Sequence, residues 1–173
     1  MTRIWPATID DVEIIFDFIN KLAIYEKEPN AVKINVAQLK EDLFPQTSGK
    51  NPRANVIFAS LDANPTKPVA FALYFYIYST WEGTSIHLED LFVLDDYRKS
   101  GVGSYLLTYI AEIAIKENCK RVEWTALDWN TPALTFYEKK VCAKRSSEWY
   151  LYRLTGQELQ NVAKGSLFSS KES

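Results

Sequence analysis

The stretch LEDLFVLDDYRKSGVGSYLLTYIAEIA, residues 88–114, predicts an apolar strand, a basic turn with two glycines and a helix in direct succession. The first N–H groups of a helix have no intrahelical partner and lie at the positive end of the helix dipole. Gly101 and Gly103 allow a ligand to approach this backbone closely, and Arg98 and Lys99 add positive charge. The turn therefore predicts a phosphate or diphosphate site, with a plain tight turn between strand and helix as the alternative.

Motif spacing and composition exclude several other classes of protein. A Walker A loop needs Gly-Lys-Ser/Thr, which the turn lacks, and a dinucleotide-binding loop needs a third glycine where Leu106 stands. The 173 residues carry 20 basic and 22 acidic side chains, a net charge of −2, so no nucleic-acid partner is expected. Cys119 and Cys142 form neither a disulfide scaffold nor a metal site, and no signal peptide or membrane-length apolar run is present. We expect a cytoplasmic protein without a metal and without a membrane partner.

Hydrophobic periodicity and turn residues predict an α/β domain. Strands are expected at residues 3–6, 55–61, 69–79, 85–94, 121–128 and 148–154, with one more considered near Ala143. Helices are expected at residues 10–25, 35–44, 103–118 and 130–140, the first after a Thr8–Asp11 capping box and the last with Pro132 in its first turn. The central sheet should be mixed, an antiparallel meander first and parallel pairing near the crossover helices. We expect one domain over residues 1–154, then a C-terminal helix or tail at 155–173 whose end is mobile.

Several motifs together resemble those of the GNAT acetyltransferases. Arg98, Gly101 and Gly103 fit the R/Q-x-x-G-x-G/A loop that binds acyl-CoA in that superfamily. The segments LAIYE (22–26), YSTWEG (78–83), LEDLFV (88–93), LDWN (127–130) and FYEKK (136–140) resemble its spermidine/spermine and thialysine N-acetyltransferase branch. The similarity runs from the first strand to about Leu154.

This resemblance implies the GNAT fold, with helices on both faces of the sheet, acetyl-CoA as co-substrate and a homodimer. It also implies a bulge in the strand that contains Glu89, which frees backbone groups for the coenzyme. The residues expected at the coenzyme are Leu91, Phe92, Val93, Arg98, Lys99, Ser100, Gly101, Val102, Gly103, Ser104, Asn130 and Ala133. Core packing is the alternative role of 91–93, and helix capping that of Asn130.

Two positions depart from the family pattern. Lys99 stands where many relatives have glycine, and Val141-Cys142-Ala143 stands where the family has Gly-Ala after its tyrosine helix. The first change should alter a backbone contact or the flexibility of the turn. The second should change how the helix ends, because glycine often caps a helix there. Neither change removes a reacting group.

The expected chemistry is acetyl transfer to an amine, by direct attack on the thioester in a ternary complex. A free alkyl amine has a pKa near about 10.4, so only about one molecule in a thousand is neutral near pH 7.5, and a base is needed. Glu89 is the candidate base, and the resemblance puts Tyr137 at the departing thiolate as an acid. A solvated or ion-paired carboxylate and a packing tyrosine are the alternatives.

The acceptor is expected to be a small cation held by acids and aromatic rings. Candidate contacts are Tyr25, Glu26, Trp81, Glu89, Asp90 and Glu148. His87 should share a strand face with Glu89, and a packing histidine is favoured over a catalytic base. The predicted function is an N-acetyltransferase for a thialysine-like amino acid, a diamine or a polyamine. A non-catalytic acyl-CoA-binding module and a protein or peptide acetyltransferase are the alternatives.

Overall fold

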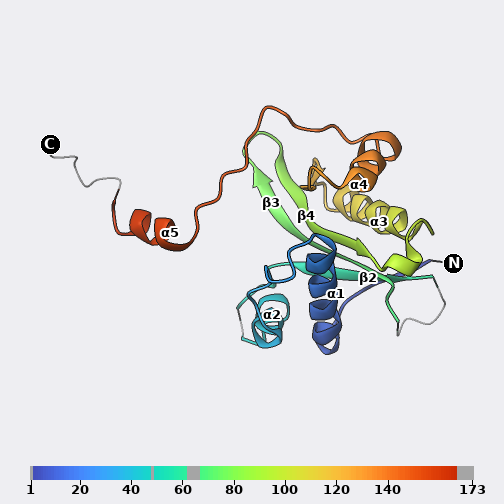
Figure 1. Ribbon diagram of the computed structural model, residues 1–173, viewed down its shortest axis with the longest axis horizontal. Coiled ribbons are helices and arrows are strands. Elements are labelled where there is room, and N and C mark those ends of the chain that lie inside the picture. The colour runs from blue at the N-terminus through green and yellow to red at the C-terminus, as the bar shows by residue number, and fades with distance from the viewer. Residues whose placement is uncertain (1, 48, 62–66, 167–173) are drawn as a thin grey trace. The chain divides into compact units, whose positions relative to one another are not determined.

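The computed structural model describes residues 2–47, 49–61 and 67–166 (Figure 1). The chain divides into two compact units, residues 1–127 and 128–173, which are described separately. The boundary predicted at Leu154 stays a prediction. The end of the predicted tail, 167–173, lies outside the described residues.

A five-stranded mixed sheet forms the first unit, in the order β1-β2-β3-β4-β5. The strands β1 (Arg3–Pro6), β2 (Asn55–Ser60), β3 (Ala70–Ser79) and β4 (Gly83–Val93) pair antiparallel, and β5 (Val122–Glu123) pairs parallel to β4. The predicted meander and the mixed sheet are confirmed. The strand predicted at 121–128 is shorter, because its ladder with β4 spans only two residue pairs.

Helices cover both faces of this sheet, as predicted (Figure 1). On one face lie α1 (Val12–Tyr25), which follows a 3₁₀ turn at Ile9–Asp11, and α2 (Val36–Leu43). The Asp11 carboxylate accepts hydrogen bonds from the Thr8 N–H and hydroxyl, both at 2.8 Å, so the predicted cap is present. Helix α3 (Val102–Lys116) follows a 3₁₀ turn at Asp95–Tyr97 and packs on the opposite face.

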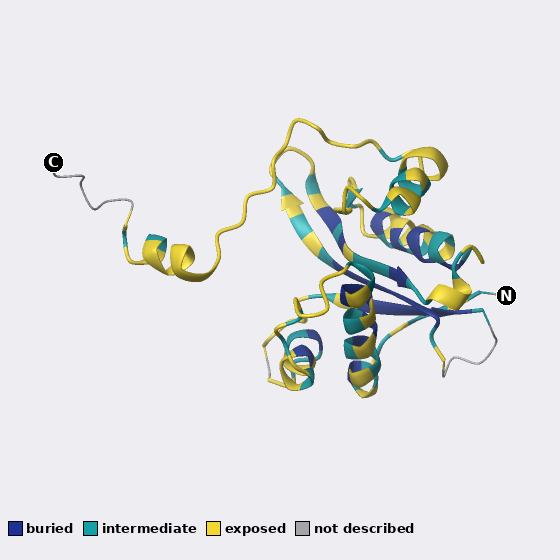
Figure 2. Ribbon diagram, in the orientation of Figure 1, coloured by how far each residue is buried: buried dark blue, intermediate teal, exposed yellow. Residues whose placement is uncertain are grey.

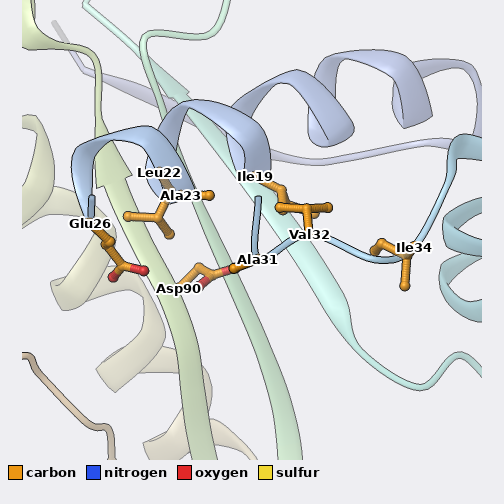
Figure 3. Close-up of a pocket in the computed structure, with 8 residues that line it drawn as sticks. All are labelled: Ile19, Leu22, Ala23, Glu26, Ala31, Val32, Ile34 and Asp90. Atoms are coloured by element: carbon orange, nitrogen blue, oxygen red, sulfur yellow. The ribbon is translucent and has the colours of Figure 1, made fainter. Parts of the chain in front are cut away.

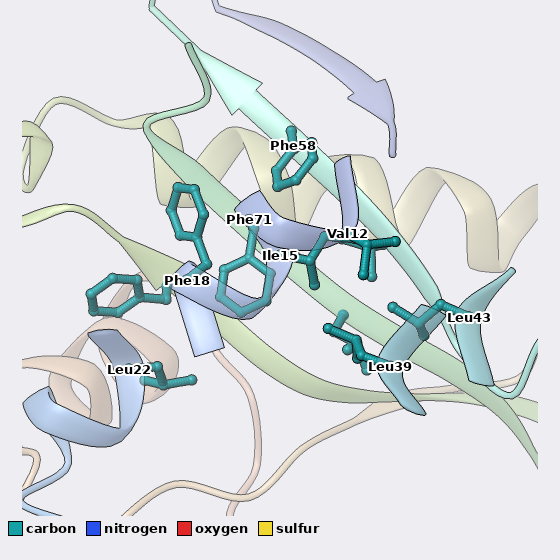
Figure 4. Packing of buried hydrophobic residues seen from close by; sticks show 11 residues of the cluster. Val12, Ile15, Phe18, Leu22, Leu39, Leu43, Phe58 and Phe71 are labelled. Atoms are coloured by element: carbon teal, nitrogen blue, oxygen red, sulfur yellow. The ribbon is translucent and has the colours of Figure 1, made fainter. Parts of the chain in front are cut away.

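Phenylalanine rings attach α1 to the sheet. The Phe18 ring centroid lies 5.9 Å from that of Phe58 on β2 and 5.2 Å from that of Phe71 on β3 (Figure 4). It lies 6.3 Å from the ring centroid of Phe92 on β4. Burying one such side chain contributes about 1.5–3 kcal/mol to stability. The buried stripes of α1 and of the central strands meet here (Figure 2). This packing fixes the C-terminal end of α1 above β4.

The second unit holds α4 (Thr131–Thr135), a π-helical turn at Phe136–Lys140 and α5 (Gly156–Ala163). The strand predicted at residues 148–154 is wrong: this segment is irregular, and so is the chain around Ala143. The aromatic composition favours a strand, but a strand needs a partner, and no described strand pairs with this segment. Trp149, Tyr150 and Tyr152 are consequently 70%, 82% and 87% exposed. Among the described residues, no helix is long and apolar enough to cross a membrane.

Candidate active site

Strand β4 contains a β-bulge at Glu89. Tyr74 of β3 pairs with Leu88 and Leu73 pairs with Asp90, so Glu89 has no residue opposite it in the ladder. Strict alternation would place Glu89 and Asp90 on opposite faces of the sheet. The extra residue instead brings Asp90 into register with Leu73, which belongs to the core under α1. The bulge that the resemblance implied is confirmed, and it coincides with the candidate base.

A pocket of about 250 Å³ lies between the end of α1 and β4 (Figure 3). Glu26, after the last residue of α1, and Asp90 supply its two carboxylates, and Figure 3 places Glu26 and Ile34 at opposite ends. An acidic end with aliphatic walls suits a cationic group on a short carbon chain. The lining residues are Ile19, Leu22, Ala23, Glu26, Ala31, Val32, Ile34 and Asp90.

The pocket concentrates negative charge. Burial, and then the charges of Glu89 and Glu26, raise the pKa of Asp90 from 3.8 to about 7. Burial also raises the pKa of the Glu26 carboxyl. A bound cation would relieve this repulsion and favour both ionised forms. The side chain of Glu89 is exposed, and its Oε2 lies 3.4 Å from the Nε2 of His87, so these two residues share a face as predicted.

Arg98 connects the glycine turn to the end of α1. Its guanidinium carbon lies 4.1 Å from the ring centroid of Tyr25 and 5.4 Å from that of Phe92. Its Nη2 lies 2.7 Å from Asp95 Oδ1, and its Nε donates to the Val93 carbonyl at 3.1 Å. The side chain predicted to bind phosphate is thus held by rings, a carboxylate and a carbonyl. Arg98 also supports Tyr25, which precedes the pocket residue Glu26.

Glycine is needed for two different reasons in this turn. Gly101 caps α3 with φ +91°, a backbone conformation that side chains disfavour. A Cβ on Gly103 would lie 3.4 Å from Val93 Cγ2 and 3.7 Å from Leu91 Cδ2, so glycine lets α3 pack closely on β4. The first-turn N–H groups of α3 have no acceptor one turn back. Both the structural and the ligand-binding reading of the glycines are therefore compatible with this geometry.

Both departures from the family pattern fall on left-handed backbone. Lys99 has φ +62° and Cys142 has φ +58°, where glycine would be unstrained. The helix before Cys142 ends in a π-helical turn, in which the Val141 N–H donates to the Phe136 carbonyl at 3.1 Å. How this helix end differs from that of the family stays a prediction.

Beyond His87, β4 separates from β5. The two strands pair only at Ile86 with Val122 and at His87 with Glu123. No strand in the described ranges pairs with Leu91, Phe92 and Val93 on this side of β4. This side of β4 therefore offers backbone groups that lie outside the sheet ladder.

Four predicted site residues belong to the second unit. Asn130 caps α4 by accepting from the Ala133 N–H at 3.4 Å, and the Tyr137 ring packs 5.4 Å from that of Phe136. Glu148 is exposed in the irregular segment. Their roles toward the residues of β4 stay predictions.

The lining of this pocket and the predicted acceptor contacts overlap only in part. Trp81 is 83% exposed in the turn between β3 and β4 and does not line the pocket. Sequence reasoning missed the pocket wall formed by Ala31, Val32 and Ile34, which follow the helix break at 27–30. The apolar residues after that break were the available signal. No set of three or more His, Cys, Asp or Glu side chains in the described ranges is arranged to hold a metal ion.

Comparisons with known proteins agree on one family. A model of the acetyltransferase (GNAT) family matches residues 22–141. The chain is 35% identical over 157 residues to a thialysine N-epsilon-acetyltransferase of Sus scrofa, covering 86% of this chain and 89% of that protein. It is 33% identical over 170 residues to the Mus musculus protein of the same name, covering 94% and 97%. An integron cassette protein from the mobile metagenome of V. cholerae matches with a TM-score of 0.74 at 28% identity, covering 94% and 98%.

The raised pKa of Asp90 predicts a pH-dependent gain of stability in Asp90→Asn. Ionised Asp90 is disfavoured in the folded protein, so its protonated form stabilises the fold, and this contribution is lost as pH rises through about 7. Asp90→Asn should raise the free energy of unfolding by about 1–3 kcal/mol at pH 8, and the gain should shrink as pH falls toward 4. Urea unfolding across this pH range measures it. The exposed control Asp96→Asn should show no such trend; a constant difference for Asp90→Asn would contradict the assignment.

Proposed function

The chain belongs to the GNAT family of acetyltransferases, and we propose that it transfers the acetyl group of acetyl-CoA to the primary amine of a small cationic acceptor. The predicted fold is confirmed by the family match and by the structural neighbour, and the predicted N-acetyltransferase class by the family match and the two mammalian relatives. The observation that carries the acceptor class is the pocket in which Glu26 and Asp90 face an aliphatic wall next to the bulge at Glu89.

The acceptor that we favour is a thialysine-like amino acid, in keeping with the names of the two mammalian relatives. A pocket of about 250 Å³ is small, and its acids lie near one end. An ammonium group held by Glu26 and Asp90 would place a short carbon chain along Ile19 and Val32. Diamines share this chemistry, whereas a long polyamine would have to extend out of the pocket.

Glu89 is the proposed base. Its position at the bulge separates it from the ladder and places it beside Asp90, whose pKa it raises. The incoming amine is held as a cation by the pocket, and Glu89 accepts the proton that must leave before nitrogen can attack the thioester carbon. The new N–C bond forms as the C–S bond breaks.

The turn at 98–104 is the proposed site of the coenzyme diphosphate. The backbone N–H groups of Val102, Gly103 and Ser104 would donate to it at the positive end of α3, and the exposed Lys99 would add charge. Arg98 acts on this turn chiefly through its contacts inside the protein. The backbone of 91–93, outside the ladder to β5, would bind the pantetheine arm and donate to the thioester oxygen.

Four further proposed site residues belong to the second unit. Tyr137 is the proposed acid, because a phenol can donate a proton to the departing thiolate without first being charged. Asn130 and Ala133 would contact the pantetheine, with the Asn130 side chain already accepting from the Ala133 N–H. Glu148 would add a carboxylate near the acceptor. A small acidic pocket disfavours an extended peptide acceptor, and a non-catalytic protein would not need a carboxylate at the position of Glu89.

We further propose a cytoplasmic homodimer. Cys119 and Cys142 are free thiols, which suits a reducing compartment. The exposed aromatic segment at 148–154 offers apolar surface that a second copy would cover. Sedimentation equilibrium should give twice the chain mass of 19.9 kDa, and a single species at the chain mass would contradict the dimer.

Turnover of amines by Glu89→Gln tests the reaction itself. Wild-type protein should release free thiol from acetyl-CoA with thialysine and short diamines, and poorly with lysine peptides. Glu89→Gln should lower kcat about 100-fold at pH 7.5 and less at pH 10, where the amine arrives neutral. Tyr137→Phe should lower kcat at both pH values, because it acts on the leaving group. Thiol release that no amine stimulates would favour the non-catalytic alternative.

Calorimetric titration with coenzyme A tests the glycine turn. Gly101→Asp places a carboxylate where the diphosphate is proposed, so the Kd should rise about tenfold or more. Gly49→Asp is the matched control, because Gly49 has a similar φ of +86° against +91° for Gly101, and a Cβ would have space at both positions. It should leave the Kd unchanged. Equal affinities for the two variants would place the coenzyme elsewhere.

A further inference from the structure

The one histidine of the sequence, His87, lies between two carboxylates on the first unit's sheet. Its Nε2 is 3.4 Å from Glu89 Oε2 on β4, and its Nδ1 is 3.7 Å from Glu123 Oε1 on β5. The two ring nitrogens thus face different acids. An imidazole in this arrangement can accept a proton on one nitrogen and release one from the other.

The ring is held in this orientation by packing. Phe75 pairs with His87 across the β3–β4 ladder, and the two rings stack with centroids 5.1 Å apart and planes 29° apart. The His87 side chain is 21% exposed. The stack covers a face of the imidazole and leaves its nitrogen-bearing edge for the carboxylates.

Arg121 holds Glu123, the acid on β5, in place. Arg121 Nε donates to Glu123 Oε2 at 2.6 Å, and its Nη1 donates to Glu82 Oε2 at 2.5 Å. Glu123 therefore presents its second oxygen, Oε1, to His87. Glu123 and Glu82 are 41% and 48% exposed, so this end of the cluster reaches bulk water.

We propose that His87 relays to Glu123 and bulk water the proton that Glu89 takes from the acceptor amine, an inference that rests on the proposed role of Glu89. An acceptor and a thioester bound beside Glu89 would displace the water that reaches its exposed carboxylate. The route through His87 stays open, because it leaves the site along the sheet toward β5.

The relay conserves protons at every step. Glu89 passes its carboxyl proton to His87 Nε2, and His87 passes the Nδ1 proton to Glu123 Oε1, which releases it to water. The imidazole then returns to its first tautomer by exchange with water. Both separations exceed the usual 2.7–3.2 Å of a hydrogen bond, so each transfer needs a bridging water or a small rotation.

Carboxylates lie on both sides of His87. In the described ranges these are Glu89 on β4, Glu123 on β5 and Arg121, while β3 contributes the uncharged ring of Phe75. Asp90, next to Glu89, adds negative charge at the inner end. His87 is thus a positioning and relay residue, and Glu89 is the group that touches the substrate.

Two variants of the intact protein test the relay. His87→Gln keeps an amide that can hold Glu89 but cannot shuttle a proton, and His87→Ala leaves room for an added imidazole. Both should lower kcat about tenfold at pH 7.5 with KM values for both substrates nearly unchanged, and less at pH 10. Added imidazole should restore kcat in His87→Ala. Wild-type protein and the slowed Tyr137→Phe should not respond to imidazole.

The outcomes separate this inference from the proposed function. If Glu89→Gln loses activity mainly at neutral pH while both His87 variants keep the wild-type rate, the relay is overturned and the base remains. A loss in the His87 variants that is equal at all pH values and insensitive to imidazole also overturns the relay, because a structural defect gives that pattern. If Glu89→Gln has no effect, both proposals are overturned. Thermal unfolding of His87→Gln and His87→Ala checks that each variant is folded.

Discussion

The bulge at Glu89 is the constraint on which the site depends. Without the extra residue, alternation along β4 would turn Asp90 away from α1 and break up the acidic pocket. With it, His87, Glu89 and Asp90 lie close together on one side of the sheet, and Leu91 packs against α3 next to Gly103. A single inserted residue therefore separates the face proposed to bind the amine from the face proposed to bind the coenzyme.

Concentrating acids at this point destabilises the empty protein. Asp90 is buried beside Glu26 and Glu89, which raises its pKa to about 7. Apolar packing compensates for this destabilisation, because Phe18 and its neighbours hold α1 on the sheet whatever the charge of the acids. Arg98 stabilises the same helix end through the ring of Tyr25. Packing of the apolar core thus offsets the cost of burying these acids, and the proposed cationic acceptor would lower that cost.

Hydrophobic periodicity and turn residues predicted the elements that depend mainly on interactions between neighbours in the sequence. The apolar stripe of α1, the β3–β4 meander and the glycine turn follow from period and turn chemistry. The strand expected at 148–154 failed because β-propensity cannot supply a partner strand. The Arg98–Tyr25 contact and the Ala31–Ile34 pocket wall could not be predicted, because they depend on where two distant segments meet. The acids of the pocket were predicted through the family resemblance. Their raised pKa values could not be predicted, because these depend on burial in the folded protein.

Lys99 lies in a left-handed backbone conformation that favours glycine, and the structure shows how the turn accommodates it. A side chain at φ +62° costs about 1–2 kcal/mol relative to glycine, which the flanking structure must offset. On one side Arg98 is fixed by Asp95, Val93 and the Tyr25 ring, and on the other Gly103 docks α3 against β4. The backbone between these anchors has little freedom, so the turn keeps its shape with lysine at this position. Lysine at this position costs backbone stability but adds a cation on the exposed side of the turn, where it would attract the anionic coenzyme proposed to bind there.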